Sequence, residues 1–181
     1  MNAGIITLIV VGAVVLLIAC CCLTCCLSNS SWIKRKREVW DANSKITETA
    51  CGAIEYSMRG AAPYILLLHG APGAHDGASN FAARWVEGGF GVIAPSRPGY
   101  GRTPHDSGKS YAAQADCFAA LLDVLQIDKV IPYGVSAGGP AAIHFAARHP
   151  DKTAALLLEA AVTGPMTHPI EQHLDSGAVK I

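Results

Sequence analysis

The sequence predicts an α/β protein with a doubly wound, mostly parallel sheet, preceded by one transmembrane helix. Short apolar runs that suit strands buried on both faces alternate with segments of helical spacing, which is typical of a parallel sheet covered by helices. One of these runs joins the next helix through a glycine-flanked turn. The apolar residues that make up 51% of the chain are concentrated near its start.

The N-terminal segment has the length and composition of a membrane anchor. Residues 3–27 carry no charge, and at 1.5 Å per residue they can cross a hydrocarbon core of about 30 Å. A cleaved signal peptide is the alternative, but residues 1–15 lack the Lys or Arg of a positive n-region. Trp32 and the basic cluster at residues 34–37 favour the cytoplasmic side. We therefore expect a single-pass anchor whose C-terminal domain faces the cytoplasm.

These features divide the chain into an anchor at residues 1–31, a basic juxtamembrane linker at 32–45 and a partial α/β domain at 46–181. The anchor ends in a cysteine run that fits neither zinc-ligand spacing nor a disulfide framework. A reducing, cytosolic setting suits these thiols. Two interpretations stay open: S-palmitoylation, which would make the protein a lipoprotein, or simple packing of soft apolar residues against lipid. The run comprises Cys20, Cys21, Cys22, Cys25 and Cys26.

The first strands of the soluble part follow the linker. Mixed alternation of apolar and polar residues predicts strands at Ile46–Thr49 and Cys51–Arg59, and Gly60–Pro63 supplies the next turn. Tyr64–Leu68 is a continuous apolar run, which indicates a strand buried on both faces of the sheet.

The middle of the chain alternates helix and strand. Asn80–Glu87 suits a short helix and Phe90–Ala94 a buried strand, and a Gly- and Pro-rich loop follows at Ser96–Pro104. Ser110 is placed to cap an amphipathic helix whose apolar positions continue to Ile127.

The last elements surround a candidate nucleophile. Val130–Tyr133 suits a strand and Thr153–Leu158 a further buried strand, with a turn and a helix between them. The turn reads Gly134-Val135-Ser136-Ala137-Gly138, so a serine stands at its apex between small residues. A serine on a sharp turn can be held beside a base and backbone N–H donors, as nucleophilic catalysis requires. A plain glycine-rich turn is the alternative.

Three motifs together carry a resemblance to a known family: His69-Gly70-Ala71-Pro72-Gly73, the loop Ser96–Gly101 with Thr103, and the Gly134–Gly139 turn. Residues 46–163 resemble the first half of an α/β-hydrolase domain. The resemblance implies hydrolysis of a small-molecule ester, thioester or amide through an acyl-enzyme. It implies no cofactor and no metal.

The resemblance assigns roles to individual residues. Ser136 would be the nucleophile, and the backbone N–H groups of Ala137 and Ala71 would form the oxyanion hole, because Pro72 has no N–H. His69 would be structural, and Arg97 would fix its loop. Relatives with an aspartate nucleophile, such as epoxide hydrolases, are disfavoured by the serine at the apex. Prolyl-aminopeptidase-like enzymes usually carry a bulky aromatic where this chain has Ala137.

The rest of the family's triad is harder to place. In the family an acid and then a histidine follow the serine, yet only residues 137–181 remain, so we expect a fragment with an exposed apolar edge at its sixth strand. Glu159 is a candidate acid, and His168 and His173 are candidate bases.

Three functions follow from these observations. The first is a membrane-anchored serine hydrolase, and the alternative is a catalytically inactive hydrolase-like binding module. The third is an acylated anchor with a scaffold domain. A net charge of zero and a pI near 7.0 give no sign of the excess positive charge that is typical of nucleic-acid-binding proteins.

Overall fold

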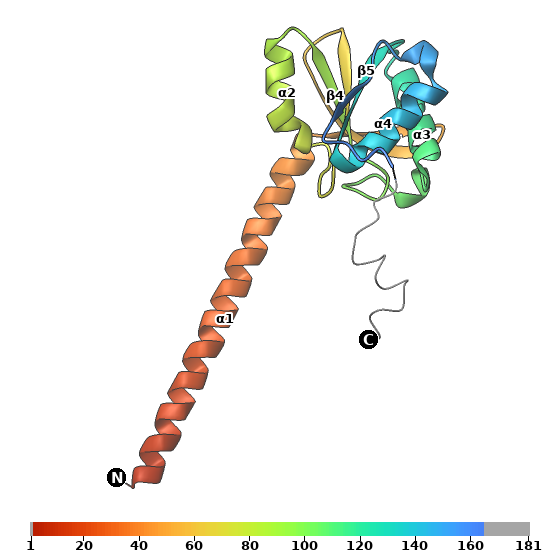
Figure 1. The fold of residues 1–181 in the computed structure, drawn as a ribbon. Helices are drawn as coiled ribbons and strands as arrows, with labels where there is room; N and C mark the ends of the chain where they lie inside the picture. Colours follow the sequence, from red (N-terminus) through yellow and green to blue (C-terminus); the bar gives the residue numbers. More distant parts are fainter. Residues whose placement is uncertain (1, 165–181) are drawn as a thin grey trace, which may run out of the picture. The chain divides into compact units, whose positions relative to one another are not determined.

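The computed structural model describes residues 2–164, which divide into two units, one ending at Ala42 and one beginning at Asn43 (Figure 1). The first unit is α1 (Ala3–Ala42), an unbroken helix. All residues from 8 to 40 are exposed. By length and composition alone, Leu8–Ala42 could cross a membrane. The basic segment expected as a linker is therefore helical as far as Ala42.

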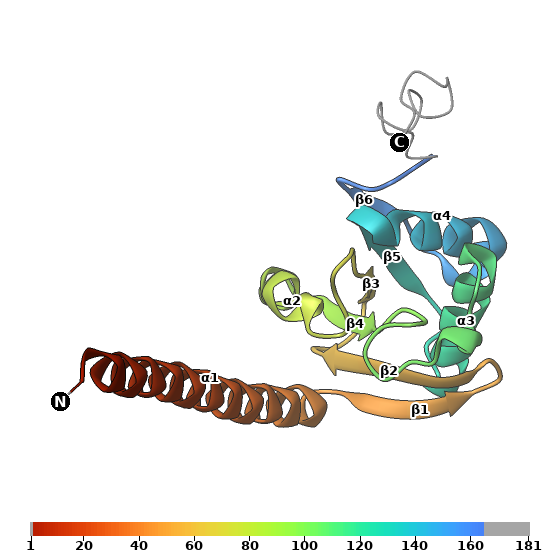
Figure 2. The same cartoon turned by 90° about the horizontal axis from the view of Figure 1, so that it is seen from below.

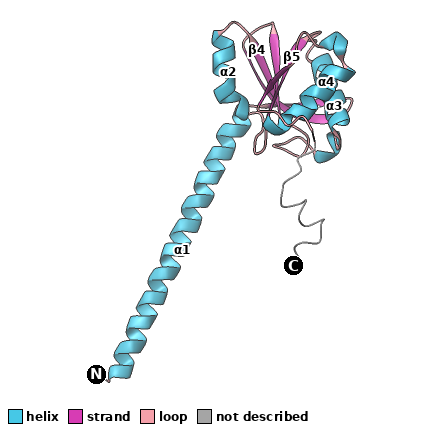
Figure 3. Ribbon diagram, viewed as in Figure 1, coloured by secondary structure: helices cyan, strands magenta, loops and turns pink. Residues whose placement is uncertain are grey.

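The second unit is built on a six-stranded sheet in the order β1-β2-β4-β3-β5-β6 (Figure 3, magenta). β1 pairs with β2 and β2 with β4 in antiparallel fashion, whereas the pairs β4–β3, β3–β5 and β5–β6 are parallel. The sheet is thus mixed, with its parallel part beginning at β4. The strands are β1 (Lys45–Thr49), β2 (Gly52–Arg59), β3 (Tyr64–Leu68), β4 (Gly91–Pro95), β5 (Val130–Val135) and β6 (Leu157–Glu159).

Helices cover both faces of this sheet, as Figure 2 shows. Leu66 and Leu68 of β3 pack in the core formed with α3 (Tyr111–Val124) and α4 (Gly139–Arg148). The alternate residues Ile65 and Leu67 pack in a second core with Ala82 and Trp85 of α2 (Gly77–Glu87). Because neighbouring residues of a strand point to opposite faces, the continuous apolar run of β3 fills both cores.

The start of α3 confirms the cap expected at Ser110. The Ser110 hydroxyl accepts a hydrogen bond from the Ala113 N–H at 3.2 Å, which satisfies one of the unpaired donors of the first turn. The helix then buries Phe118, Leu121 and Leu122.

The sixth strand differs from the expectation of a buried strand at 153–158. Only Leu157–Glu159 is regular strand, and Thr153 makes an isolated bridge to Val130. Leu158 is 42% exposed. Within residues 2–164, β6 is one of the two edge strands of the sheet, so it has a partner on one side only.

Candidate active site

Ser136 stands at the junction of β5 and α4, on a single turn of 3₁₀ helix at Ser136–Gly138. Its φ is +50°, in the left-handed region that residues other than glycine seldom adopt. Such a conformation costs free energy and persists only where the surroundings impose it. The turn therefore has the strained strand-to-helix geometry of a nucleophile elbow.

Glycines on both sides of Ser136 make this turn sterically possible. A Cβ on Gly134 would lie 2.8 Å from the Cβ of Ala142, and one on Gly138 would collide with the Leu68 carbonyl. Both positions let α4 approach the ends of β5 and β3. Only residues without a side chain fit there.

The chain that follows β6 also packs against the elbow. The Val162 N–H donates to the Ser136 carbonyl at 2.9 Å, and a Cβ on Gly139 would lie 2.6 Å from that of Ala161. The start of α4 is thus fixed from the β6 side as well.

The loop after β3 lies directly against Ser136. A Cβ on Gly70 would be 3.0 Å from the Ser136 Cβ and 3.5 Å from its Oγ. Ala71 follows Gly70, so the loop brings the predicted oxyanion donor to the neighbourhood of Ser136. The first N–H groups of a helix have no intrahelical acceptor, which applies to Ala137. The roles of Ala71 and Ala137 as donors stay predictions.

His69 at the start of this loop is buried and bonded at both ring nitrogens. Nε2 lies 2.9 Å from the Arg97 backbone N–H, and Nδ1 lies 2.7 Å from the Gly70 carbonyl oxygen. Because a backbone N–H can only donate, Nε2 accepts and Nδ1 carries the proton. Burial, opposed by the bond to Gly70, lowers the pKa of His69 to about 4. The ring is neutral at physiological pH and agrees with the expected structural role.

Arg97 connects the loop after β4 to the elbow. The residue is 4% exposed, and its guanidinium donates from Nη1 to the Ala137 carbonyl at 3.0 Å. The same group lies over the Tyr100 ring, 5.0 Å from its centroid. Burial lowers the pKa of Arg97, with the nearby tyrosines acting against that effect. These polar contacts are of the kind expected for Arg97.

A buried carboxylate that belongs to none of the sequence motifs organises the same loop. Glu55 of β2 is fully buried and accepts from the Ser44 and Ser96 hydroxyls and from the Arg102 backbone and side chain, each at 2.8 Å. His75 Nε2 lies 3.7 Å from Oε1. Burial alone would raise the pKa of Glu55, but the donors from Arg102, Ser44 and Ser96 outweigh it and the pKa is lowered.

Ser96 extends this network to His75, which follows the His69–Gly73 loop. Its Oγ accepts from the His75 N–H at 3.1 Å while donating to Glu55. The Ser57 hydroxyl in turn donates to the His75 carbonyl at 3.0 Å. In the sequence, the only signal of this hydrogen-bond network is Glu55 itself, a glutamate at a strand position between the apolar residues Ile54 and Tyr56.

Glu159, the candidate acid, lies at the end of β6 opposite Val135. Its carboxylate accepts from the Tyr133 hydroxyl and from Arg84 Nη2, the latter at 2.9 Å. The Tyr133 hydrogen bond and then the Arg84 contacts lower the pKa of Glu159. Arg84 belongs to α2, so its hydrogen bond connects Glu159 to the face of the sheet that α2 covers. Its catalytic role stays a prediction.

No histidine contacts the Ser136 hydroxyl or Glu159 within residues 2–164. His144 stacks on Tyr111 with ring centroids 6.2 Å apart, and His149 Nε2 lies 3.0 Å from an Asp116 oxygen. His168 and His173, the candidate bases, lie outside the described residues.

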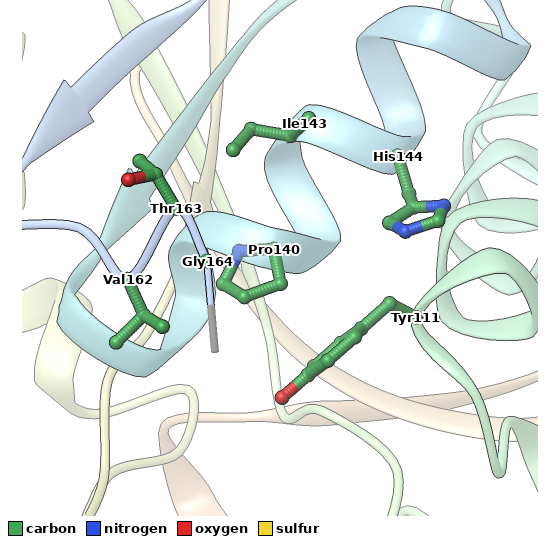
Figure 4. Close-up of a pocket in the computed structure, with 7 residues that line it drawn as sticks. All are labelled: Tyr111, Pro140, Ile143, His144, Val162, Thr163 and Gly164. Carbon is green, nitrogen blue, oxygen red and sulfur yellow. The ribbon is translucent and has the colours of Figure 1, made fainter. Parts of the chain in front are cut away.

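A hollow of about 460 Å³ opens beside the first turns of α4 (Figure 4). Tyr111 and His144 form one side, and residues 162–164 form the other. Ser136 is not among its lining residues, which are Tyr111, Pro140, Ile143, His144, Val162, Thr163 and Gly164. Within the described part of the chain, no three His, Cys, Asp or Glu side chains are grouped to hold a metal ion.

Comparisons with known proteins agree with this geometry. Residues 63–180 match the family model of the alpha/beta hydrolase fold. The uncharacterised hydrolase YcgS of Bacillus subtilis is 38% identical over 128 residues, which cover 71% of this chain and 45% of that protein. A 2-hydroxy-6-oxononadienedioate/2-hydroxy-6-oxononatrienedioate hydrolase of Klebsiella pneumoniae is 32% identical over 57% of this chain and 38% of its own length.

A solved structure supports the same assignment. An alpha/beta hydrolase fold protein from Nakamurella multipartita superposes with a TM-score of 0.61 and 36% identity, covering 72% of this chain and 47% of that one. The chain therefore spans less than half the length of these relatives. The strained Ser136 elbow, the loop packed against it and the family match together show that the chain belongs to the α/β-hydrolase family.

Proposed function

We propose that this chain forms the nucleophile-bearing part of a serine hydrolase that cleaves a small-molecule ester, thioester or amide through an acyl-enzyme. The observation that carries the proposal is the position of Ser136: a left-handed apex residue between glycines, with the His69–Gly73 loop packed against its side chain. The relatives that are named hydrolases support hydrolysis as the reaction.

In the proposed reaction, the Ser136 Oγ attacks the substrate carbonyl carbon and gives its proton to a histidine base. The Ala71 and Ala137 N–H groups hold the oxyanion of the tetrahedral intermediate. The intermediate collapses, the C–O, C–S or C–N bond to the leaving group breaks, and the histidine protonates that group. Water then hydrolyses the acyl-Ser136 ester. The base is a histidine outside residues 2–164, and Glu159 is the candidate for the acid that orients it.

We further propose that α1 anchors the domain in a membrane with the basic cluster at residues 34–37 on the cytoplasmic side. The exposure of every residue from 8 to 40, apolar side chains included, supports this placement. The five clustered cysteines, all exposed, are the proposed sites of S-acylation. The protein should resist alkaline extraction from membranes, and hydroxylamine should release its acyl groups.

A fluorophosphonate probe tests the proposed chemistry, because it phosphonylates an activated serine without requiring knowledge of the substrate. The full-length protein is expected to react, and its Ser136→Ala variant is expected not to react while keeping the circular-dichroism spectrum of the wild type. A folded, unreactive wild-type protein would contradict the proposal. It would favour the alternative, an inactive binding module, which the absence of a hydrogen bond to the Ser136 hydroxyl within residues 2–164 also motivates.

A further inference from the structure

We propose that His69 is a positioning residue of the oxyanion hole: its imidazole, bonded at both nitrogens, fixes the peptide that carries the Ala71 N–H. This inference rests on the proposed serine-hydrolase function. It goes beyond that function, because it predicts that His69, although it is a structural residue, affects the rate of the chemical step. His69 touches no substrate in this scheme. It acts through the backbone of Gly70 and Ala71.

The geometry of a single peptide group carries the argument. The Gly70 carbonyl and the Ala71 N–H belong to the same peptide, and in a trans peptide these groups point in opposite directions within one plane. The Nδ1–H of His69 holds the carbonyl oxygen at 2.7 Å. The N–H is consequently turned away from the imidazole, and a hydrogen bond to the carbonyl also polarises the N–H and strengthens it as a donor.

The imidazole itself is held on three sides. The Arg97 N–H donates to Nε2 at 2.9 Å, and the Tyr100 ring packs in an edge-on arrangement with centroids 5.0 Å apart. A Cβ on Gly73 would lie 2.9 Å from Nδ1 and 3.0 Å from the Gly70 oxygen. The loop can therefore close over the His69–Gly70 bond only because residue 73 has no side chain.

Arg97 connects this arrangement to the second donor. Its backbone N–H binds His69, and its guanidinium binds the Ala137 carbonyl at 3.0 Å. One buried residue thus contacts both the histidine that orients Ala71 and the residue that supplies the other N–H. The two halves of the oxyanion hole, on loops distant in sequence, are held relative to each other through Arg97.

Two amide substitutions in the full-length protein separate the two bonds of the imidazole. In His69→Asn the amide nitrogen can take the place of Nδ1 and keep the bond to Gly70, while the bond to the Arg97 N–H is lost. In His69→Gln the longer side chain places an amide oxygen near the position of Nε2, so the Arg97 bond is kept and the Gly70 bond is lost. The two variants are matched in chemistry and differ in which bond survives.

The measurement is kcat and KM for p-nitrophenyl acetate, with the fluorophosphonate reaction rate as a second readout. Loss of one oxyanion-hole donor costs on the order of 10²–10³ in kcat. We expect a decrease of that order in His69→Gln with KM nearly unchanged, and a decrease below about tenfold in His69→Asn. Equal kcat values in the two folded variants, or a change confined to KM, would overturn the inference while leaving the serine-hydrolase proposal intact.

A spectroscopic measurement decides the matter if the variants do not fold. In wild-type protein labelled with ¹⁵N-histidine, the His69 ring should be neutral and protonated on Nδ1 from about pH 5 to 9, because burial lowers its pKa to about 4. A ring protonated on Nε2, or charged in this range, would overturn the inference. A folded wild-type protein inactive toward both probes would refute the proposed function, and the inference with it.

Discussion

The guanidinium of Arg97 donates to the carbonyl of Ala137, the residue that follows the proposed nucleophile Ser136, at 3.0 Å. Arg97 is 4% exposed, so this bond joins the loop after β4 to the elbow inside the protein. The Ala137 carbonyl is partly buried, and a partly buried carbonyl that loses a hydrogen-bond donor keeps part of the cost of desolvation. The contact should therefore contribute to stability as well as to the geometry of the site.

Replacing Arg97 with methionine should lower the free energy of unfolding by about 1–3 kcal/mol, because the Ala137 carbonyl is left without its donor. Urea denaturation of the full-length protein measures this loss. Arg148→Met is the matched control. Arg148 makes two bonds to Asp116, at 2.9 and 2.7 Å, but on the surface, where water replaces the lost partner. An equal loss in both variants would contradict the role given to Arg97.

The backbone conformation of Ser136 predicts an unusual order of stabilities. With φ at +50°, a Cβ at this position is strained, and glycine removes the strain. Ser136→Gly should be more stable than Ser136→Ala by about 1 kcal/mol, although glycine ordinarily costs stability. Neither variant should react with a fluorophosphonate. Thermal unfolding compares the two, and a more stable alanine variant would mean that the left-handed turn is absent.

Glu55 should make the free energy of unfolding depend on pH in the acidic range. Its pKa is lowered in the fold from an ordinary value of 4.5, although burial alone would raise it, because Arg102, Ser44 and Ser96 donate to it. A carboxylate with a lowered pKa stabilises the fold above its unfolded pKa, and this contribution is lost as the pH falls through the folded pKa. His75, 3.7 Å away, also faces the carboxylate.

The difference in unfolding free energy between the wild type and Glu55→Gln should thus be largest near neutral pH and shrink below about pH 4.5. Urea titrations across this range provide the measurement. Glu48→Gln, at an exposed position of β1, is the control and should stay close to the wild type throughout. A difference independent of pH would show that folding leaves the pKa of Glu55 unchanged, and a difference that instead favours the wild type more as the pH falls would show that folding raises it.

Substitution by alanine should cost different amounts of stability at two glycines with positive φ. Gly89 (φ +86°) has open space around it, whereas a Cβ on Gly101 (φ +55°) would collide with the Glu55 carboxylate. Gly89→Ala should cost only the backbone strain, about 1–2 kcal/mol. Gly101→Ala should cost clearly more, and chemical denaturation would show it. Similar losses would indicate that the Glu55 network adapts easily.

The parts of the fold that depend on local pattern could be predicted from the sequence. The run at Tyr64–Leu68, the cap at Ser110 and the elbow at Ser136 each follow from neighbouring residues. The Glu55 network could not be predicted, because Ser96 and Arg102 reach it from a loop remote in sequence. The short β6 was also mispredicted. The apolar residues at 153–158 predict a buried strand. In the structure, β6 pairs with β5 only and leaves Leu158 exposed.

The unbroken course of α1 sets how deep each cysteine of the proposed anchor would lie. At 1.5 Å per residue, with Trp32 at the interface, Cys26 lies about 9 Å along the axis toward the bilayer centre and Cys20 about 18 Å. A hydrocarbon core about 30 Å thick has its midplane near 15 Å. In the proposed anchor, Cys25 and Cys26 would thus be within reach of an enzyme working at the membrane surface, whereas Cys20, Cys21 and Cys22 would lie near the midplane. Acylation would then divide the cysteine run into two modified and three unmodified thiols.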